Sequence, residues 1–280
     1  MVIPPHVAEL VRLALEEDLG RGDLTAQAVP AQARARARLI AKGECVAANL
    51  FVAELVVREA GAEAQVQFAA QDGQLLARGA PVLTITGNAR DILSIERTML
   101  NFLQRSFGVA TLSRRFAAAV EGHPVRLTDT RKTLPGFRFL DKSAVRAGGL
   151  YNHRFGLDGG ILVKENHIRA AGGIRAAVET LRMGVPHGLK IQVEVTSRSE
   201  AFEAIEAGAE ALLLDNFSPR DIPVKEIRAH APQVLLEASG GVGLGNVAEF
   251  AAAGVDLISI GALTHSVPAA DLSLLFELEA

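Results

Sequence analysis

Six short apolar runs recur through the C-terminal part of the chain, each the length of a buried strand. They are VRLTDT (125–130), GGILVKEN (159–166), KIQVEV (190–195), ALLLDN (211–216), QVLLEAS (233–239) and LISIGAL (257–263). Stretches with helical spacing, such as SEAFEAIEAG and NVAEFAAAG, lie between the later runs. This alternation predicts parallel strands joined by right-handed crossovers. Because a full barrel has eight strands, we expect an α/β barrel that is open and has about six.

The first part of the chain has a different pattern. Apolar residues behind two early prolines follow helical spacing up to Gly20 and predict an opening amphipathic helix. Over residues 34–88, alternating positions and glycine-containing turns predict short antiparallel strands around one helix. A long helix follows over about residues 89–120, with Ile92 and Met99 on one face. We therefore expect a compact α+β domain that this helix joins to the barrel.

The overall composition excludes several classes of protein. With 49% hydrophobic and 22% charged residues, the chain is globular and not disordered. A net charge of −3 favours neither nucleic acid nor an anionic membrane as a partner. Cys45 is the only cysteine, which excludes an internal disulfide and suits a reducing compartment. No signal-peptide pattern and no apolar run of about 18 residues is present, so we expect a cytoplasmic protein that does not span a membrane.

Cationic residues gather in one stretch of this slightly acidic chain, between residues 128 and 167. They are Arg131, Lys132, Arg138, Lys142, Arg146, His153, Arg154, Lys164 and His167. Because the stretch lies between two apolar runs, we expect the ends of two strands and their connecting loop to present these cations around one cavity. The ligand of such a cavity should be small and strongly anionic.

Acidic residues also stand where strands end. In parallel sheets, active sites lie beyond the carboxyl ends of the strands, and Asp129, Lys164, Glu194, Asp215 and Glu237 fall there. Glu194 and Asp215 would project from neighbouring strands toward Lys164. Two such carboxylates suit a hydrated Mg²⁺ that substrate phosphates also bind.

Glycines follow two of the later strands. Gly240, Gly241 and Gly243 precede a helix expected to begin near Asn246, and their backbone N–H groups can bind a phosphate. Gly261 and the following alanine could supply a second contact of this kind.

Longer segments resemble a known family. DTRKTLPGFRFLDKSAVRAGGLYNHRFGLDGGILVKENHI closely resembles the signature of the quinolinate phosphoribosyltransferases, and EEDLGRGDLT, ERTMLNFLQRSFGVAT, LLLDNFSP, LEASGGV and ISIGALTHSVPAADLSL stand in family order around it. The resemblance implies an N-terminal α/β sandwich domain over residues 1–110, with a tail at about 266–280 packed on it, and an open barrel over 111–265. It further implies a homodimer in which each sandwich domain covers the partner's barrel.

The resemblance also implies the reaction, in which quinolinate and phosphoribosyl pyrophosphate give nicotinate mononucleotide, pyrophosphate and CO₂. The residues it implies for quinolinate are Arg131, His153, Arg154 and Lys164, with Arg105 from the other subunit. Those it implies for phosphoribosyl pyrophosphate and its Mg²⁺ are Lys132, Lys164, Glu194, Asp215, Ser239, Gly240, Gly241, Gly261 and Ala262. Lys132, Lys164, Glu194 and Asp215 are expected to be catalytic, Glu194 and Asp215 to hold the metal, and no organic cofactor is expected.

Alternatives remain for the function and for single residues. A pyrophosphorylase-like protein associated with molybdenum utilisation shares the DTRKT and NHR-like segments but is not expected to keep KENHI and GALTHS. A barrel aldolase or decarboxylase would use Lys164 as a Schiff-base nucleophile. A noncatalytic phosphate-binding module has no need of opposed carboxylates. Arg105 could simply pair with Glu96 or another acid.

The chain departs from the family pattern at a few positions. Leu150 and Tyr151 stand where the family commonly has glycine and arginine, Leu134 replaces a frequent threonine, and Gly243 takes another threonine position. None of these is expected to be a principal catalytic residue. Tyr151 in place of arginine removes a cation and weakens the local positive field. Gly243 in place of threonine makes the phosphate loop less rigid.

Overall fold

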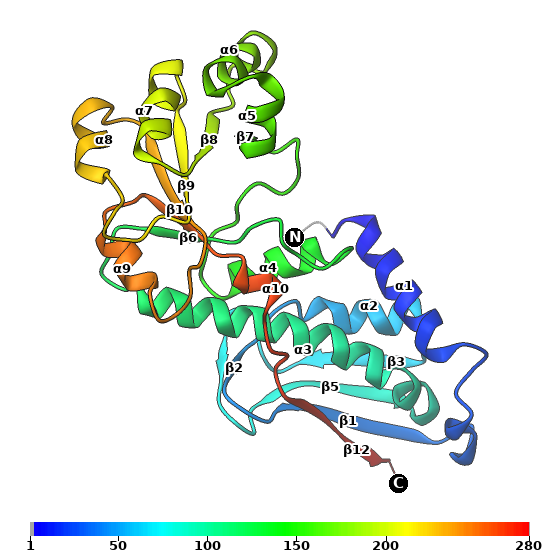
Figure 1. Ribbon diagram of the computed structural model, residues 1–280. Helices are drawn as coiled ribbons and strands as arrows, with labels where there is room; N and C mark the ends of the chain where they lie inside the picture. The colour runs from blue at the N-terminus through cyan, green and yellow to red at the C-terminus, as the bar shows by residue number, and fades with distance from the viewer. Residues whose placement is uncertain (1–2, 280) are drawn as a thin grey trace. The chain divides into compact units, whose positions relative to one another are not determined.

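The computed structural model describes residues 3–279, which fold into two compact units (Figure 1). The first unit contains the chain up to Arg114, the segment Thr133–Gly149 and the chain from Leu263 onward. The second contains Arg115–Lys132 and Leu150–Ala262.

The two units differ from the expected domains in one segment. The sequence predicted a sandwich domain over residues 1–110 with a tail at about 266–280, and a barrel over residues 111–265. Thr133–Gly149, placed by that division in the barrel, belongs to the first unit. Its helix α4 (Arg138–Ala147) buries Leu140 in the core of that unit. The segment after α4 also packs closely there, because a Cβ added at Gly148 would lie 2.5 Å from the Ala110 carbonyl oxygen.

The first unit is built on an antiparallel sheet of four strands in the order β12-β1-β5-β3. These are β1 (Arg34–Ala41), β3 (Ala64–Phe68), β5 (Pro81–Asn88) and β12 (Leu272–Leu278), and a separate pair is formed by β2 (Cys45–Val46) and β4 (Leu75–Leu76). Along β1, alanine and leucine are buried while the alternate arginines face water, as a strand with one solvated face requires. The expected antiparallel strands are therefore confirmed, and β12 pairs along β1.

Helices of the first unit follow the apolar spacing of the sequence. They are α1 (Pro5–Leu19), α2 (Phe51–Glu59), the long α3 (Ala89–Ala119) that begins there, α4 and the short turns η1 (Thr25–Ala28) and α10 (Ala262–His265). Ile92, Met99 and Phe107 on α3 are fully or almost fully buried in one core. Gly108 lets the C-terminal segment approach α3, because a Cβ there would lie 2.2 Å from the Pro268 carbonyl oxygen.

The second unit is a parallel sheet of six strands in the order β6-β11-β10-β9-β8-β7. The strands are β6 (Arg126–Thr128), β7 (Ile161–Val163), β8 (Ile191–Val195), β9 (Ala211–Asp215), β10 (Leu235–Ser239) and β11 (Leu257–Ser259). All six fall within the predicted apolar runs. The first strand lies beside the last, while β6 and β7 form the two edges of the sheet. This is the open barrel that the count of strands predicted.

Helices alternate with these strands along the chain. They are α5 (Glu165–Ala171), α6 (Ile174–Gly184), α7 (Arg198–Ala207), α8 (Val224–His230) and α9 (Val247–Ala252). Ser197 caps the start of α7 by accepting a hydrogen bond from the Glu200 N–H, and Gly208 ends it at a φ of +97°. Among residues 3–279, no helix is both long and apolar enough to cross a bilayer.

Candidate active site

The register of the parallel strands puts several polar side chains on one face of the sheet. Asp215 on β9 lies opposite Ser239 on β10, and Glu194 on β8 lies opposite Leu213, two residues before Asp215. Since residues in register share a face and alternate along each strand, Glu194, Asp215, Glu237 and Ser239 stand on the same side. The local sequence explains the placement, because each acid follows buried apolar residues near a strand's carboxyl end.

The two expected catalytic acids lie with the two expected lysines. Lys164 Nζ is 2.9 Å from Glu194 Oε2, and the Lys164 side chain is 51% exposed. The pKa of Asp215 lies above its ordinary value, because burial and the negative charge of Glu194 outweigh the opposing charges of Lys164 and Lys132. The charges of Glu194, Lys164 and Lys132 therefore all act on Asp215, and Lys164 pairs directly with Glu194.

Two arginines of the cationic stretch also lie near each other. The pKa of Arg154 is lowered, first by burial and then by the positive charge of Arg131. The Arg154 guanidinium donates a hydrogen bond to the Gly160 carbonyl oxygen at 2.7 Å. Two positive charges that lie close together in a partly buried place repel each other, and a bound anion reduces this repulsion.

A cavity of about 510 Å³ adjoins Arg154. Its walls are mainly apolar and include Leu157, Ile161, Val163 and Leu181, with His167 also on the lining. A cavity of this size with few polar groups is typical of a small-molecule site.

The loop that carries Arg154 is fixed by a buried acid, Asp129, which the sequence placed at a strand end but to which it gave no particular role. Asp129, fully buried, accepts hydrogen bonds from the His153 backbone N–H at 2.8 Å and from Asn152 Nδ2 at 2.6 Å. His153 Nδ1 accepts from the backbone N–H of Arg154 at 2.8 Å, and its Nε2 is 3.4 Å from Glu237 Oε2. Both ring nitrogens of His153 thus have contacts within the protein.

The phosphate loop after β10 has backbone angles that suit glycine. Gly240 and Gly241 have φ values of +89° and +62°, and a Cβ at Gly240 would lie 2.2 Å from Asn216 Oδ1. Asn216 in turn donates from Nδ2 to Asp215 Oδ2 at 2.8 Å. The loop is therefore packed directly against the residue that follows Asp215.

Gly243 does not present its N–H as the sequence analysis expected, because that group donates to Asn246 Oδ1 at 2.8 Å. The Gly243 side of the loop serves to start α9 and is less available to a phosphate. Ser239, Gly240 and Gly241 stand at the end of β10, and Ala262 begins α10 directly after Gly261.

Two of the departures from the family pattern have a structural role. Tyr151 donates its N–H to the Leu127 carbonyl oxygen at 3.0 Å and forms a parallel bridge with Thr128, so the chain here extends the edge of β6. The Arg126 guanidinium lies over the Tyr151 ring at 5.5 Å. Leu150 is buried, whereas Leu134 is 45% exposed.

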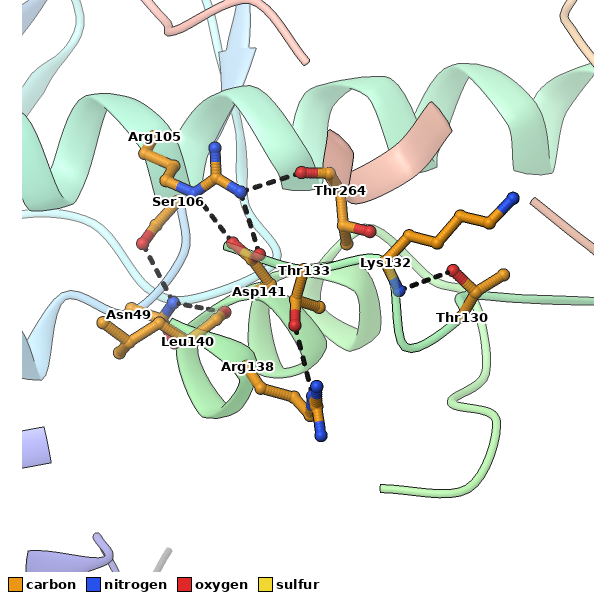
Figure 2. A network of polar contacts seen from close by, with 10 residues as sticks. All are labelled: Asn49, Arg105, Ser106, Thr130, Lys132, Thr133, Arg138, Leu140, Asp141 and Thr264. Atoms are coloured by element: carbon orange, nitrogen blue, oxygen red, sulfur yellow. Dashed lines mark hydrogen bonds and ion pairs between the residues drawn. The ribbon is translucent and has the colours of Figure 1, made fainter. Parts of the chain in front are cut away.

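Arg105 belongs to the first unit, where its guanidinium is held on several sides (Figure 2). It donates to both oxygens of Asp141, at 2.9 and 2.8 Å, and to the Thr264 carbonyl oxygen at 2.8 Å. Asp141 is 1% exposed. Arg105 thus pairs with an acid, as one alternative held, and that acid is Asp141 and not Glu96.

Figure 2 also shows how nearby backbone is fixed. Asn49 Nδ2 donates to Ser106 Oγ and to the Leu140 carbonyl oxygen, which ties α4 to α3 within the first unit. In the second unit, the backbone N–H of Lys132 donates to Thr130 Oγ1 at 3.0 Å.

Comparison with known proteins places this arrangement in a family. Residues 23–107 match the model of the N-terminal domain of quinolinate phosphoribosyl transferase, and residues 109–275 match that of its C-terminal domain. This chain belongs to the quinolinate phosphoribosyltransferase family. The two matches together cover most of its length.

Relatives similar to the chain over nearly its whole length carry names of the same family. A probable nicotinate-nucleotide pyrophosphorylase (carboxylating) of a Synechocystis strain is 41% identical over 93% of this chain and 89% of its own. The nicotinate-nucleotide pyrophosphorylase (carboxylating) of Mycobacterium leprae is 41% identical over 95% of each chain. A solved nicotinate-nucleotide pyrophosphorylase of Francisella tularensis has a TM-score of 0.91 at 37% identity and covers 99% of this chain and 98% of its own. The fold and the family resemblance inferred from the sequence are therefore confirmed.

Proposed function

We propose that this chain transfers the phosphoribosyl group of phosphoribosyl pyrophosphate to quinolinate with loss of CO₂, giving nicotinate mononucleotide and pyrophosphate in NAD biosynthesis. The observation that carries this proposal is the pairing of Lys164 with Glu194 beside Asp215, in a chain whose two domains both match the family. The cationic arginines support an anionic substrate, and the acids support a charged sugar donor.

Quinolinate has two carboxylates on a flat ring. Arg131 and Arg154 are proposed to bind them, because a planar guanidinium fork matches a carboxylate and the two positive charges lie close enough for Arg131 to lower the pKa of Arg154. Lys164 adds a point charge. The apolar wall of the adjoining cavity offers contact for the pyridine ring. His153 is proposed to bind quinolinate as well.

Phosphoribosyl pyrophosphate is proposed to lie at the acidic side of the site. Glu194 and Asp215 offer carboxylate oxygens as ligands, and burial followed by the negative charge of Glu194 raises the pKa of Asp215, so the two fit a Mg²⁺ ion that the substrate brings. When bound, that ion would supply positive charge to the departing pyrophosphate. Lys132 and Lys164 are proposed to neutralise the same group, and Ser239, Gly240, Gly241, Gly261 and Ala262 to contact phosphate.

The proposed chemistry begins with attack of the pyridine nitrogen on C1 of the ribose as pyrophosphate leaves. Glu194 and Asp215 stabilise the positive charge that develops on the sugar. The bond to ribose makes the ring cationic, and this charge stabilises the carbanion that remains when the adjacent carboxylate leaves as CO₂. That carbon then takes up a proton from water, which gives nicotinate mononucleotide. No covalent nucleophile is needed. The exposure of Lys164 and its pairing with Glu194 are unlike the desolvated amine of a Schiff-base enzyme.

We further propose a cytoplasmic homodimer. Arg105 is proposed to complete the partner's site, in which case its guanidinium would exchange part of its contact with Asp141 for a substrate carboxylate. Mixing inactive Arg105→Ala subunits with inactive Lys132→Ala subunits tests this, because shared sites restore part of the activity. Mixed dimers without any recovery would refute sharing.

The reaction itself is tested by measuring nicotinate mononucleotide and CO₂ from quinolinate and phosphoribosyl pyrophosphate with Mg²⁺, with nicotinate as the control substrate. Product is expected only with quinolinate. The Arg131→Ala variant should lose roughly 100-fold or more in kcat/KM, as removal of a charge-assisted contact commonly does. Absence of product from the wild-type enzyme, or trapping of Lys164 by borohydride with an oxo-acid, would refute the proposal.

A further inference from the structure

A buried carboxylate lies on the same face of the sheet as the candidate site and has no part in the chemistry above. Glu237 stands on β10 and is 3% exposed. Its Oε2 accepts a hydrogen bond from Gln192 Nε2 at 2.8 Å and lies 3.4 Å from His153 Nε2. A buried carboxylate is costly in free energy unless hydrogen bonds replace the water it has lost. The contacts of Gln192 and His153 with Glu237 therefore indicate a specific role for this acid.

The charge of Glu237 follows from its neighbours. Burial by itself raises the pKa of this carboxyl group, but the hydrogen bonds of His153 and Gln192, with a smaller contribution from Ser259, bring the pKa below its ordinary value. Ser259 contributes least, since its hydroxyl is near the carboxylate without a well-formed hydrogen bond. Glu237 therefore stays ionised at neutral pH and presents an acceptor to Nε2 of His153.

The other nitrogen of the ring determines where the proton of His153 lies. Nδ1 accepts a hydrogen bond from the backbone N–H of Arg154 at 2.8 Å. A nitrogen that accepts cannot carry the proton, so the hydrogen-bond network assigns the proton to Nε2, which faces Glu237. The ring thus connects a buried acid on one side to the backbone of Arg154 on the other.

We propose that Glu237 is a positioning residue, which holds the His153 ring in its Nε2–H form and through that ring fixes the backbone of Arg154. The part of this inference that concerns binding rests on quinolinate as the substrate. On this basis Glu237 acts on quinolinate binding through His153 and Arg154. Loss of Glu237 should then weaken quinolinate binding far more than phosphoribosyl pyrophosphate binding.

The first test measures the protonation of the His153 ring in the wild-type protein. Long-range ¹H–¹⁵N spectra of protein labelled at histidine distinguish protonated from unprotonated ring nitrogens, and a His153→Gln variant identifies the signals of this ring. At neutral pH, Nε2 of His153 should be protonated and Nδ1 should not. A proton on Nδ1, or on both nitrogens, would overturn the proposal.

The second test compares variants at one position. Glu237→Gln keeps an oxygen acceptor for Nε2 and should keep the Nε2–H spectrum. Glu237→Met has a similar length without an acceptor, and it should mix the two ring forms and raise the KM for quinolinate roughly tenfold, as expected for one lost charge-assisted hydrogen bond. Its KM for phosphoribosyl pyrophosphate should change less than about twofold. Ser259→Ala is the matched control, because it alters the same pocket and should change neither the spectrum nor either KM.

The two readouts separate this inference from the proposed function. Glu237→Met with an unchanged His153 spectrum and an unchanged KM for quinolinate would overturn the positioning role. The expected spectrum in a protein that does not turn over quinolinate would overturn the proposed function and leave the assignment of the Glu237–His153 pair supported.

Discussion

Asp129 is the residue whose replacement tests most directly how the cationic loop is held. Its carboxylate is fully buried and accepts from the His153 N–H at 2.8 Å and from Asn152 Nδ2 at 2.6 Å. Asp129→Ala removes both acceptors and leaves two donors without them. Because a hydrogen bond to a charged group is worth about 1.5–3 kcal/mol, the variant should lose roughly 3–5 kcal/mol of the free energy of unfolding.

Urea unfolding followed by far-ultraviolet circular dichroism measures this loss in a chain that has no tryptophan. Asn152→Ala, alone and combined with Asp129→Ala, completes a double-mutant cycle. The two residues should be coupled by about 1.5–3 kcal/mol, the worth of a hydrogen bond to a charged group such as the one from Asn152 Nδ2 to Asp129 Oδ2. A loss below about 1 kcal/mol for Asp129→Ala, or losses that simply add in the double variant, would refute the reasoning.

Two further predictions concern the acids and the phosphate loop. Glu194→Gln removes the negative charge that raises the pKa of Asp215, so that pKa should fall toward its ordinary value and Asp215 should ionise at lower pH; a carboxyl ¹³C titration measures the shift. Gly240→Ala places a Cβ 2.2 Å from Asn216 Oδ1 at a φ of +89° and should cost about 1–3 kcal/mol of stability while raising the KM for phosphoribosyl pyrophosphate. Gly243→Ala, where a Cβ would meet nothing within 4 Å, is the control, and equal effects of the two would contradict the steric argument.

Most of the fold could be predicted because its signals are local. Each of the six parallel strands lies within a short apolar run, and the apolar face of α3 follows the helical period that Ile92 and Met99 show. Thr133–Gly149 could not be assigned in this way. Its membership of the first unit depends on Leu140 and Gly148 packing against residues distant in the sequence, and a periodic pattern does not specify that partner.

The candidate site was predictable in its charges but not in its internal supports. Strand-end position and family resemblance located Glu194, Asp215 and Lys164, which the structure brings together. The pairing of His153 with Glu237 could not be derived, since each residue alone fits several roles. The useful signal was Glu237 itself, an acid in an otherwise apolar strand, because a buried charge requires a partner.

The strand order of the first unit has a consequence for synthesis of the protein. β1 pairs on one side with β5, whereas its other neighbour, β12, is synthesised only after all of the second unit. Until then, one edge of β1 offers open backbone groups to any other extended chain. Translational pausing ahead of residue 272 should therefore lower the yield of folded protein, and nascent chains halted there should aggregate through that edge.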